Sequence, residues 1–291
     1  MLIRHLEFFV TLAEEGHFGR AADLCGVSQP ALSLAIRKLE EDLGTPLILR
    51  GQRFQGLTAE GEKALVWGRQ ILSDYRNLKS DLNGRRVGGL TGVLRLGVSA
   101  AAMPLMPEFC AGFERRNPLT RTQITLLTAA EIQAGLQDFS LDGGIGWLPG
   151  QGKGMTPLWR THLRFACRAD HPFAEGGPLT MADAMTQPLC QIADMPVKVQ
   201  AAILCSGLDA VLAHLRSGAW CSLVPDSFAA LLSDTDDIRL IPLADGGAPH
   251  TLGGMVIPRS PQTPMVRGFE DALAALSPAQ GNARQAQEDP T

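Results

Sequence analysis

The sequence lacks the cysteine and histidine spacings that build disulfide frameworks and metal sites. Its six cysteines lie far apart without a Cys-x-x-Cys pair, and its six histidines form no His-x-x-x-His motif. Scattered cysteines of this kind are typical of reduced, mostly buried thiols in an intracellular protein. We therefore expect no bound metal and no cofactor.

Long hydrophobic runs and a secretory signal are also missing. No apolar stretch reaches about 18 residues, so no transmembrane helix is predicted. The N-terminal segment is apolar but contains Glu7, Glu14 and Glu15, and no small-residue cleavage site follows it. These absences predict a cytoplasmic protein that does not associate with a membrane.

The common signatures of α/β enzymes are absent too. There is no Gly-x-Ser-x-Gly motif, no Walker phosphate loop and no Rossmann glycine fingerprint. The glycine-rich residues 150–154 lack the spacing of a phosphate loop, and no carboxylate pair or nucleophile with a placed base is evident. We expect no catalytic residues, and an α/β enzyme is a remote alternative.

An excess of basic charge is missing as well. The formal net charge is −4, with 26 basic and 30 acidic side chains, of which residues 1–90 hold 12 and 11. Phosphate contact depends on local clustering, and a modest basic group is formed by Arg37, Lys38, Arg50 and Arg53. Charge therefore permits a nucleic-acid partner without indicating one.

Residues 18–43 are the most informative stretch and predict two helices joined by a tight turn. The first helix presents a short apolar face formed by Ala21, Ala22 and Leu24. Gly26 follows where the chain must leave helical geometry. Ser28 supplies an N-cap oxygen for the second helix, and Pro30 stands in its opening turn, where a missing N–H costs least.

The second helix combines a buried stripe with a polar face. The stripe recurs at spacings of four, three and four residues, in Leu32, Ile36, Leu39 and Leu43. Gln29, Ser33 and Arg37 lie off this stripe and carry the donors and acceptors that read base edges in a major groove. The pattern predicts a DNA-binding helix-turn-helix. An ordinary helical hairpin with a solvated polar face is the open alternative.

The flanking segments extend this unit. Residues 2–14 show helical apolar spacing and would close a three-helix core over the hairpin. Residues 45–58 read as a β-hairpin with Arg50 and Arg53 near its turn, which predicts a basic wing beside the recognition helix. A plain solvated turn is the alternative for this segment. The DNA-binding domain is therefore expected to span residues 1–58.

A long helix is predicted for residues 59–83, with Thr58 as its cap. Its apolar positions form a narrow, heptad-like seam made of Ala64, Gly68, Ile71, Tyr75, Leu78 and Leu82. We expect Ile71, Tyr75, Leu78 and Leu82 to dimerise with a second copy, whereas packing against the same chain is the alternative. The glycine-rich residues 84–92 would form a hinge.

From residue 93 the pattern alternates between strands and helices. Strands are expected at 93–98, 121–127, 144–147, 162–168, 191–192, 221–224, 238–243 and 252–257. Helices are expected at 102–116, 131–139, 179–185, 208–216, 227–232 and 264–276. This order predicts an α/β domain over 93–278, with lobe I at about 93–163 and 257–278 and lobe II at about 164–256. Residues 279–291 are expected to be a disordered tail.

Two strand ends of this domain are candidate ligand contacts. A strand that feeds a helix N-terminus presents free N–H groups to a ligand. Ser99, Ala100 and Ala101 occupy that place after the first strand, and Thr128 ends the neighbouring strand. Ser99 and Thr128 could equally be simple helix caps, so both interpretations stay open.

The residues in order follow a known pattern. The matching segments are Leu6-Glu7-Phe8-Phe9, Gly16-His17-Phe18, Arg20-Ala21-Ala22, Ser28-Gln29-Pro30-Ala31-Leu32-Ser33, Leu39-Glu40, Leu43-Gly44, Pro46-Leu47, Leu57-Thr58 and Gly61. Through them the chain resembles the LysR-type transcriptional regulators, strongly over residues 2–66 and more weakly to about residue 276. At Leu34 this family often carries a basic or polar residue, so a DNA contact is lost there.

The resemblance implies a fold class. It consists of an N-terminal all-α winged helix-turn-helix domain with a long linker helix, then an α/β, two-lobed, periplasmic-binding-protein-like effector domain. Such proteins act as homodimers or homotetramers on double-stranded promoter DNA, under control of a small-molecule effector between the lobes. By position, Gln29, Ser33 and Arg37 would face bases. Ser28, Arg50 and Arg53 would then face phosphates.

The resemblance also adds residues to the effector site, namely Gly146, Trp147, Pro196 and Val197. Some acid-sensing relatives carry a cationic side chain at the position of Gly146, so its absence weakens the case for a carboxylate effector. His162, Arg164 or Lys198 could substitute for that charge. The effector class stays open.

A cysteine-based redox sensor on the same scaffold is the second functional alternative. Cys190, Cys205 and Cys221 all fall in lobe II. The peroxide-sensing members of the family, however, carry two cysteines in one short loop. Here the nearest pair is more widely separated, and Cys221 lies in an expected core strand.

Overall fold

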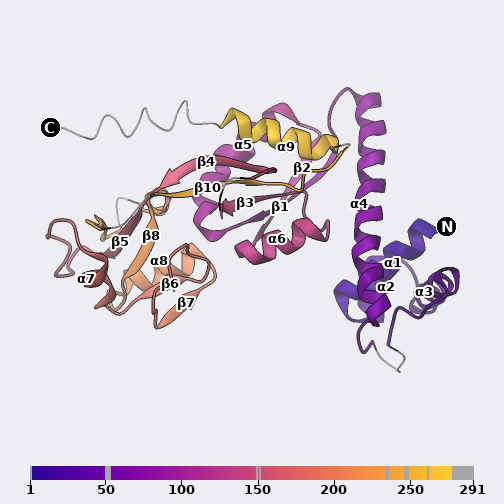
Figure 1. Cartoon of the computed structure of the whole chain (residues 1–291), viewed down its shortest axis with the longest axis horizontal. Coiled ribbons are helices and arrows are strands. Elements are labelled where there is room, and N and C mark those ends of the chain that lie inside the picture. The colour runs from indigo at the N-terminus through magenta and orange to yellow at the C-terminus, as the bar shows by residue number, and fades with distance from the viewer. Residues whose placement is uncertain are drawn as a thin grey trace. The chain divides into compact units, whose positions relative to one another are not determined.

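The computed structural model describes residues 2–49, 54–148, 150, 152–233, 236–245, 249–260 and 262–276 (Figure 1). The predicted wing residues Arg50 and Arg53, and the predicted tail 279–291, lie outside the described residues. The chain divides into one unit of Met1–Arg86 with Gln137–Ser140 and a second unit of Val87–Leu136 with Leu141–Thr291. None of the described helices is both long and apolar enough to cross a bilayer.

The first unit is built from helices α1 (Leu2–Glu15), α2 (Phe18–Leu24), α3 (Gln29–Leu43) and α4 (Ala59–Val87). Helix α2 begins at His17, whose Nδ1 accepts hydrogen bonds from the N–H groups of Gly19 and Arg20 at 3.1 and 3.3 Å. Helix α3 is capped at its N-terminus by Ser28, as expected, and at its C-terminus by Gly44 in the left-handed conformation, with φ 71°. The cap at Ser28 therefore acts as predicted, and Gly44 ends the helix although no signal was predicted there.

The core of this unit corrects two of the expected apolar contacts. Leu32, Ile36 and Leu39 are buried beneath α1, together with Ala35. Leu43 is 50% exposed and Leu24 is 67% exposed. Both leucines lie in the last turn of their helices, and neither belongs to the apolar cluster that α1 covers. Helical spacing placed them on the correct face but could not show how far that face is covered.

Helix α4 packs on α1 through a glycine. A Cβ atom added at Gly68 would lie 3.1 Å from a methyl group of Val10 and 3.2 Å from one of Leu6. The alternative of packing within the same chain therefore holds for this part of the predicted seam. Helix α4 continues to Val87, so residues 84–87 of the expected hinge are helical.

The second unit contains a five-stranded sheet in the order β2-β1-β3-β10-β4, which we call lobe I. Its strands are β1 (Gly92–Val98), β2 (Thr120–Leu126), β3 (Gly143–Trp147), β4 (Met155–Thr161) and β10 (His250–Met255). Strand β1 pairs in parallel with β2 and β3, and β10 pairs antiparallel with β3 and β4. The expected β-α-β-α-β core is therefore present.

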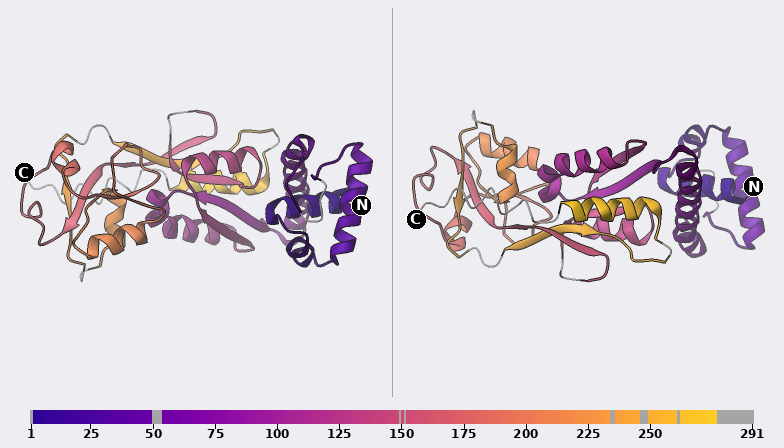
Figure 2. Two further views of the ribbon diagram at one scale, coloured as in Figure 1. Left: turned by 90° about the horizontal axis from the view of Figure 1, so that it is seen from below. Right: turned by 90° about the horizontal axis from the view of Figure 1, so that it is seen from above.

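Helices cover both faces of the lobe I sheet (Figure 1). They are η1 (Ala100–Leu105), α5 (Met106–Arg116), α6 (Ala129–Gln137) and α9 (Pro264–Ala275). Phe109, Phe113 and Phe269 bring α5 and α9 onto β1, and Figure 2 shows α9 in front in the view from above. On the other face, Ile132 and Leu136 bring α6 onto Met255. The sheet is therefore packed between helices on both of its faces.

Lobe II consists of a three-stranded sheet, β8-β5-β9, and a two-stranded sheet, β6-β7. Its elements are β5 (Leu163–Arg168), α7 (Met181–Met185), β6 (Cys190–Ile192), β7 (Ile203–Cys205), α8 (Leu208–Arg216), β8 (Ser222–Pro225), η2 (Asp226–Leu231) and β9 (Ile238–Pro242). The chain enters this lobe after β4 and leaves it before β10. The expected lobe boundaries require the same two crossings of the chain between the lobes.

Three features of the α/β unit differ from the expectation. Strand β10 belongs to the lobe I sheet, so the expected boundary at residue 256 is corrected to a position before residue 250. Strand β4 was not predicted, because Pro157 interrupts its pattern; β4 is an edge strand, where proline is tolerated. Strand β7 has three residues and gives no periodic signal.

Candidate functional sites

The N-terminal face of α3 is the candidate DNA-reading surface. Ser28, Gln29, Pro30 and Arg37 are exposed, and Ser33 is half-buried. The Ser28 hydroxyl oxygen accepts the N–H of Ala31 at 3.4 Å and so caps the helix. Within the described residues, the side chains of Gln29 and Arg37 have no hydrogen-bond partner, which leaves their polar groups available for a ligand. The five predicted residues on α3 therefore lie on one accessible surface.

A carboxylate that the sequence interpretation missed attaches the wing segment to α3. Glu40 Oε1 accepts the N–H groups of Leu47 and Ile48 at 2.7 and 3.1 Å. Ile48 then forms an antiparallel bridge with Leu57, as the predicted hairpin requires. Because Glu40 lies on the same helix as Gln29, the stem of the wing has a defined position beside the reading surface.

A glycine in α4 allows the base of the wing to lie close to that helix. A Cβ atom added at Gly61 would overlap the carbonyl oxygen of Leu47. The Thr58 hydroxyl donates to the carbonyl of Pro46 at 2.8 Å and accepts the N–H of Gly61 at 2.9 Å. Thr58 therefore caps α4, as predicted, and also fastens the base of the wing.

The four predicted dimerisation residues form an exposed apolar line on α4. Ile71 and Tyr75 are each 43% exposed, Leu78 is 54% and Leu82 is 58% exposed. Leu72, in contrast, is buried against the helical core. The helix therefore buries one face within its own unit and leaves a second apolar face open.

The predicted effector residues lie at the carboxyl ends of three neighbouring strands. Ser99 follows β1, Thr128 follows β2, and Gly146 and Trp147 end β3. Ser99 is fully buried, and among the described residues its hydroxyl has no hydrogen-bond partner. A Cβ atom at Gly146 would lie 3.1 Å from that hydroxyl oxygen. Ser99 therefore takes up the space that a larger side chain at Gly146 would need.

The remaining predicted effector residues are less well suited to polar contact. Ala100 and Ala101 are buried in η1, Pro196 is exposed and Val197 is half-buried. Ala100 packs with the apolar cluster of lobe II, whereas Ala101 packs with that of lobe I. The start of η1 is thus part of the junction between the lobes.

Thr128 functions as a helix cap. Its N–H and hydroxyl groups donate to Glu131 Oε2 at 2.8 and 2.7 Å, and its hydroxyl oxygen accepts the N–H of Glu131 at 3.3 Å. This reciprocal capping box lowers the pKa of Glu131. Of the two interpretations left open for Thr128, the structural one is therefore observed.

A second residue missed by the sequence interpretation, Asp194, lies at the same strand ends. Its Oδ2 accepts the N–H of Ala129 at 3.0 Å, and its carbonyl oxygen accepts the indole N–H of Trp147 at 2.9 Å. Burial raises the pKa of Asp194, against the lowering effect of the Ala129 N–H, and the charge of Glu131 raises it further. Trp147, predicted to contact an effector, also donates a hydrogen bond to the main chain of lobe II, and its contact with an effector stays a prediction.

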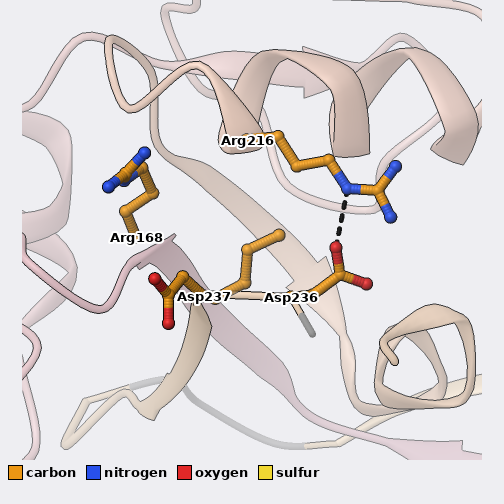
Figure 3. Close-up of a pocket in the computed structure, with 5 residues that line it drawn as sticks. Arg168, Arg216, Asp236 and Asp237 are labelled. Carbon is orange, nitrogen blue, oxygen red and sulfur yellow. Dashed lines mark hydrogen bonds and ion pairs between the residues drawn. The ribbon is translucent and has the colours of Figure 1, made fainter. Parts of the chain in front are cut away.

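A charged pocket of about 390 Å³ lies within lobe II, lined by Arg168, Arg216, Asp236, Asp237 and Ile238 (Figure 3). Arg216 donates to Asp236 at 2.6 Å, and Arg168 donates to Asp170 at 3.0 and 2.8 Å. The arginine contact, together with two hydrogen bonds from Ser233, lowers the pKa of Asp236. The Arg216–Asp236 pair therefore fastens the segment before β9 to α8, whereas the Arg168–Asp170 pair is local to the end of β5.

The cysteines of lobe II are poorly placed for redox chemistry. Cys167, Cys190, Cys205 and Cys221 are buried free thiols. Burial raises the pKa of Cys167 and of Cys190 to about 11, and that of Cys221 to about 12. The thiolate is the reactive form, so at neutral pH these three groups are almost entirely unreactive.

Two family models match the chain. The model described as bacterial regulatory helix-turn-helix protein, lysR family, matches residues 3–62. The model described as LysR substrate binding domain matches residues 88–277. The resemblance expected from the sequence is thereby confirmed over both units.

Curated relatives agree with these matches. A hydrogen peroxide-inducible genes activator of Dickeya chrysanthemi is 32% identical over 197 residues, covering 67% of this chain and 64% of the relative. The match thus spans just under two thirds of that protein. An SDS degradation transcriptional activation protein of Pseudomonas sp. (strain ATCC 19151) is 33% identical over 251 residues, covering 83% and 79% of the two chains.

A solved structure has the same fold. Full-length CbnR, crystallised in complex with its target DNA, superposes with a TM-score of 0.69 and 22% sequence identity. The similarity covers 95% of this chain and all of CbnR. At this identity the likeness supports the architecture and leaves function to the site residues.

Proposed function

Because the chain belongs to the LysR family, we propose that it is a transcriptional regulator that binds promoter DNA through α3 and responds to a small molecule. The observation that carries this proposal is the exposed polar surface of α3, with Gln29 and Arg37 unpaired in the described structure and a wing stem fixed beside it. A promoter-binding protein of this kind needs no catalytic residue and acts in the cytoplasm.

In this proposal, each part of the reading surface has a distinct task. Gln29, Ser33 and Arg37 contact base edges, because amide and guanidinium groups match the hydrogen-bond patterns of the major groove. Ser28 and the start of α3 contact phosphate, as helix N-termini do. Arg50 and Arg53 add phosphate contacts from the wing. Leu34, 68% exposed on α3, offers no such contact and narrows the footprint.

The exposed line on α4 supports the oligomeric part of the proposal. Four large, mostly apolar side chains at heptad-like spacing are exposed, and leaving such a line of apolar surface in water costs free energy. A second copy of α4 would cover them and place two reading surfaces on one DNA. We propose a homodimer through Ile71, Tyr75, Leu78 and Leu82, assembled further into a homotetramer.

The proposal is tested by replacing one base-reading side chain. Gln29→Ala should remove sequence preference for the operator while leaving weak, salt-sensitive binding, because phosphate contacts remain. A mobility-shift titration with operator and scrambled DNA measures both. Glu41→Ala, an exposed position at the other end of the same helix, is the matched control and should keep the preference. Unchanged discrimination in Gln29→Ala would refute the assignment.

Redox sensing is the second candidate, favoured by the similarity to the hydrogen peroxide-inducible genes activator of Dickeya chrysanthemi. The burial of the thiols argues against it. A variant with Cys190, Cys205 and Cys221 all replaced by alanine should still switch its promoter normally if a small molecule is the signal. Loss of switching in a folded triple variant would instead support a cysteine sensor.

A further inference from the structure

One aspartate of lobe II reaches across to a helix of lobe I. Asp194 follows β6 by two residues, and its carboxylate accepts the N–H of Ala129, 65 positions earlier in the chain. Ala129 is the first residue of α6, a helix of nine residues. Its amide is one of the N-terminal donors that no carbonyl of the helix can satisfy. The carboxylate therefore occupies the place where a helix ordinarily binds an anion.

Independent contacts hold the same short segment of lobe II against lobe I. The indole of Trp147 donates to the main-chain carbonyl of Asp194 at 2.9 Å. Met195, the next residue, packs against the apolar clusters of both lobes. The Asp194 side chain, the Asp194 carbonyl and the neighbouring Met195 side chain all contact lobe I. The position of Asp194 is therefore set by packing as well as by its charge.

The negative charge at this helix end is already high. Glu131 caps α6 through Thr128, and its charge and that of Asp194 lie close enough to raise the pKa of Asp194. A carboxylate ligand arriving here would have to displace Asp194 and then lie beside Glu131. Two like charges at one helix end repel each other, and the partial burial of Asp194 reduces the screening of that repulsion by solvent. The arrangement therefore disfavours an acidic ligand at the N-terminus of α6.

A hydroxyl at the adjacent strand end has no partner among the described residues. The Ser99 hydroxyl is fully buried and, in the part of the chain that is described, forms no hydrogen bond. Buried hydroxyls without a partner are rare in folded proteins. Ser99 can donate to or accept from a polar atom without requiring that atom to be charged.

We propose that Asp194 is a built-in anion that occupies the N-terminus of α6, joins the two lobes and excludes small carboxylates from this site. The inference rests on the proposed sensing function and restricts its ligand class. The effector presents no acidic group to α6; it offers a polar atom to Ser99 instead. Emptying the helix end by removing Asp194 creates a binding site for carboxylates.

The test uses full-length protein with acetate as the probe and acetamide as its uncharged counterpart, at constant ionic strength. Wild type should bind acetate no better than acetamide. Asp194→Ala should bind acetate at least about tenfold more tightly than wild type does, seen as an acetate-specific rise in melting temperature. Amide hydrogen exchange at Ala129 should become faster in this variant and slow again when acetate is added.

Asp183→Ala is the matched control. Asp183 also binds the N-terminus of a helix, accepting the N–H of Thr180 at 3.2 Å, but both residues belong to lobe II. Its removal should lower stability without creating acetate binding. If Asp194→Ala fails to fold, Asp194→Ser decides the question. Its side chain is uncharged and too short to replace the carboxylate oxygen at the Ala129 N–H, so it should also gain acetate binding.

Equal acetate binding by wild type and the Asp194 variants, including none in either, would overturn the proposal. The same protein preparations are titrated with operator DNA without any small molecule. Failure to bind DNA would reject the proposed regulatory function, whereas the acetate comparison would still decide the role of Asp194. The two results are therefore separable.

Discussion

The two candidate sites of this protein differ in whether their polar groups have hydrogen-bond partners within the chain. On α3, Gln29 and Arg37 are exposed, and neither side chain has a partner among the described residues. At the strand ends of lobe I, Thr128 is bound to Glu131 and Ala129 is bound to Asp194. A surface that reads DNA must keep its donors and acceptors free, because DNA brings partners with it. A buried site must satisfy most of its own polar groups whenever no ligand is present, and among the described residues at these strand ends the Ser99 hydroxyl is the exception.

The difference also explains which residues a sequence interpretation finds. Free polar side chains on a helix stand out by their spacing against the apolar stripe. Groups that are satisfied by distant parts of the chain carry no such local signal. Glu40 and Asp194, the residues that position the wing and the lobes, were accordingly missed, although both are acids with defined backbone partners.

The largest effect should come from a single added methyl group. Gly61→Ala places a Cβ atom on the carbonyl oxygen of Leu47, so the wing junction must shift, at a cost of about 3 kcal/mol in the free energy of unfolding. Gly112→Ala is the matched control in the α/β unit. Nothing lies within 4 Å of its Cβ position, and helix propensity should make it neutral or stabilising by up to about 1 kcal/mol.

Chemical denaturation of both variants, followed by probes in each unit, measures these effects. Gly61→Ala should also weaken operator binding, because the wing stem loses its position beside α3. Equal stability of the two variants would mean that the close approach at Gly61 can relax.

The next largest effect should be on assembly. Leu78→Glu places a charge in the exposed line of α4, and burying it in a dimer interface would weaken dimerisation roughly 100-fold. Sedimentation equilibrium measures the change. Lys63→Glu, an exposed position of the same helix outside the line, should leave the dimer intact. A monomeric wild-type protein, or a Leu78→Glu protein that still dimerises, would reject this interface.

A smaller effect is expected at the cap of α2. His17→Ala removes the acceptor for the N–H groups of Gly19 and Arg20 and should cost about 1 kcal/mol in the free energy of unfolding. His17→Ser, which restores an N-cap oxygen, should recover most of that loss. Thermal unfolding of the pair measures the difference. Two indistinguishable variants would show that the imidazole cap contributes nothing.

The smallest effect should appear at Asp236 and should depend on pH. The pKa of this carboxyl is lowered by Arg216 and by Ser233. Its stabilising contribution is therefore present above about pH 4, the ordinary aspartate value, and is lost as the pH falls through the lowered pKa of the folded state. Asp236→Asn should melt below wild type at neutral pH and approach it in acid. A constant difference across pH would show that the ion pair is not the cause.

Local chemistry in the sequence was sufficient for most of the fold. The caps at Ser28 and Thr58, the turn at Gly44 and the alternation of strands and helices after residue 92 depend on interactions within a few residues. Helical and strand periodicity therefore predicted α1 to α4 and the β1-α5-β2-α6-β3 order. The motifs of residues 2–66 also identified the family, because a gapless pattern of that length is specific.

Tertiary structure alone decided how these elements meet. Burial of Leu32 but not of Leu24 or Leu43 depends on how far α1 covers the hairpin. The place of β10 between β3 and β4 depends on a crossing between lobes, and Pro157 concealed the strand beside it. Above all, the contact between Asp194 and Ala129 joins positions 65 residues apart. Periodicity describes one element at a time, whereas such a contact exists only once two folded lobes come together.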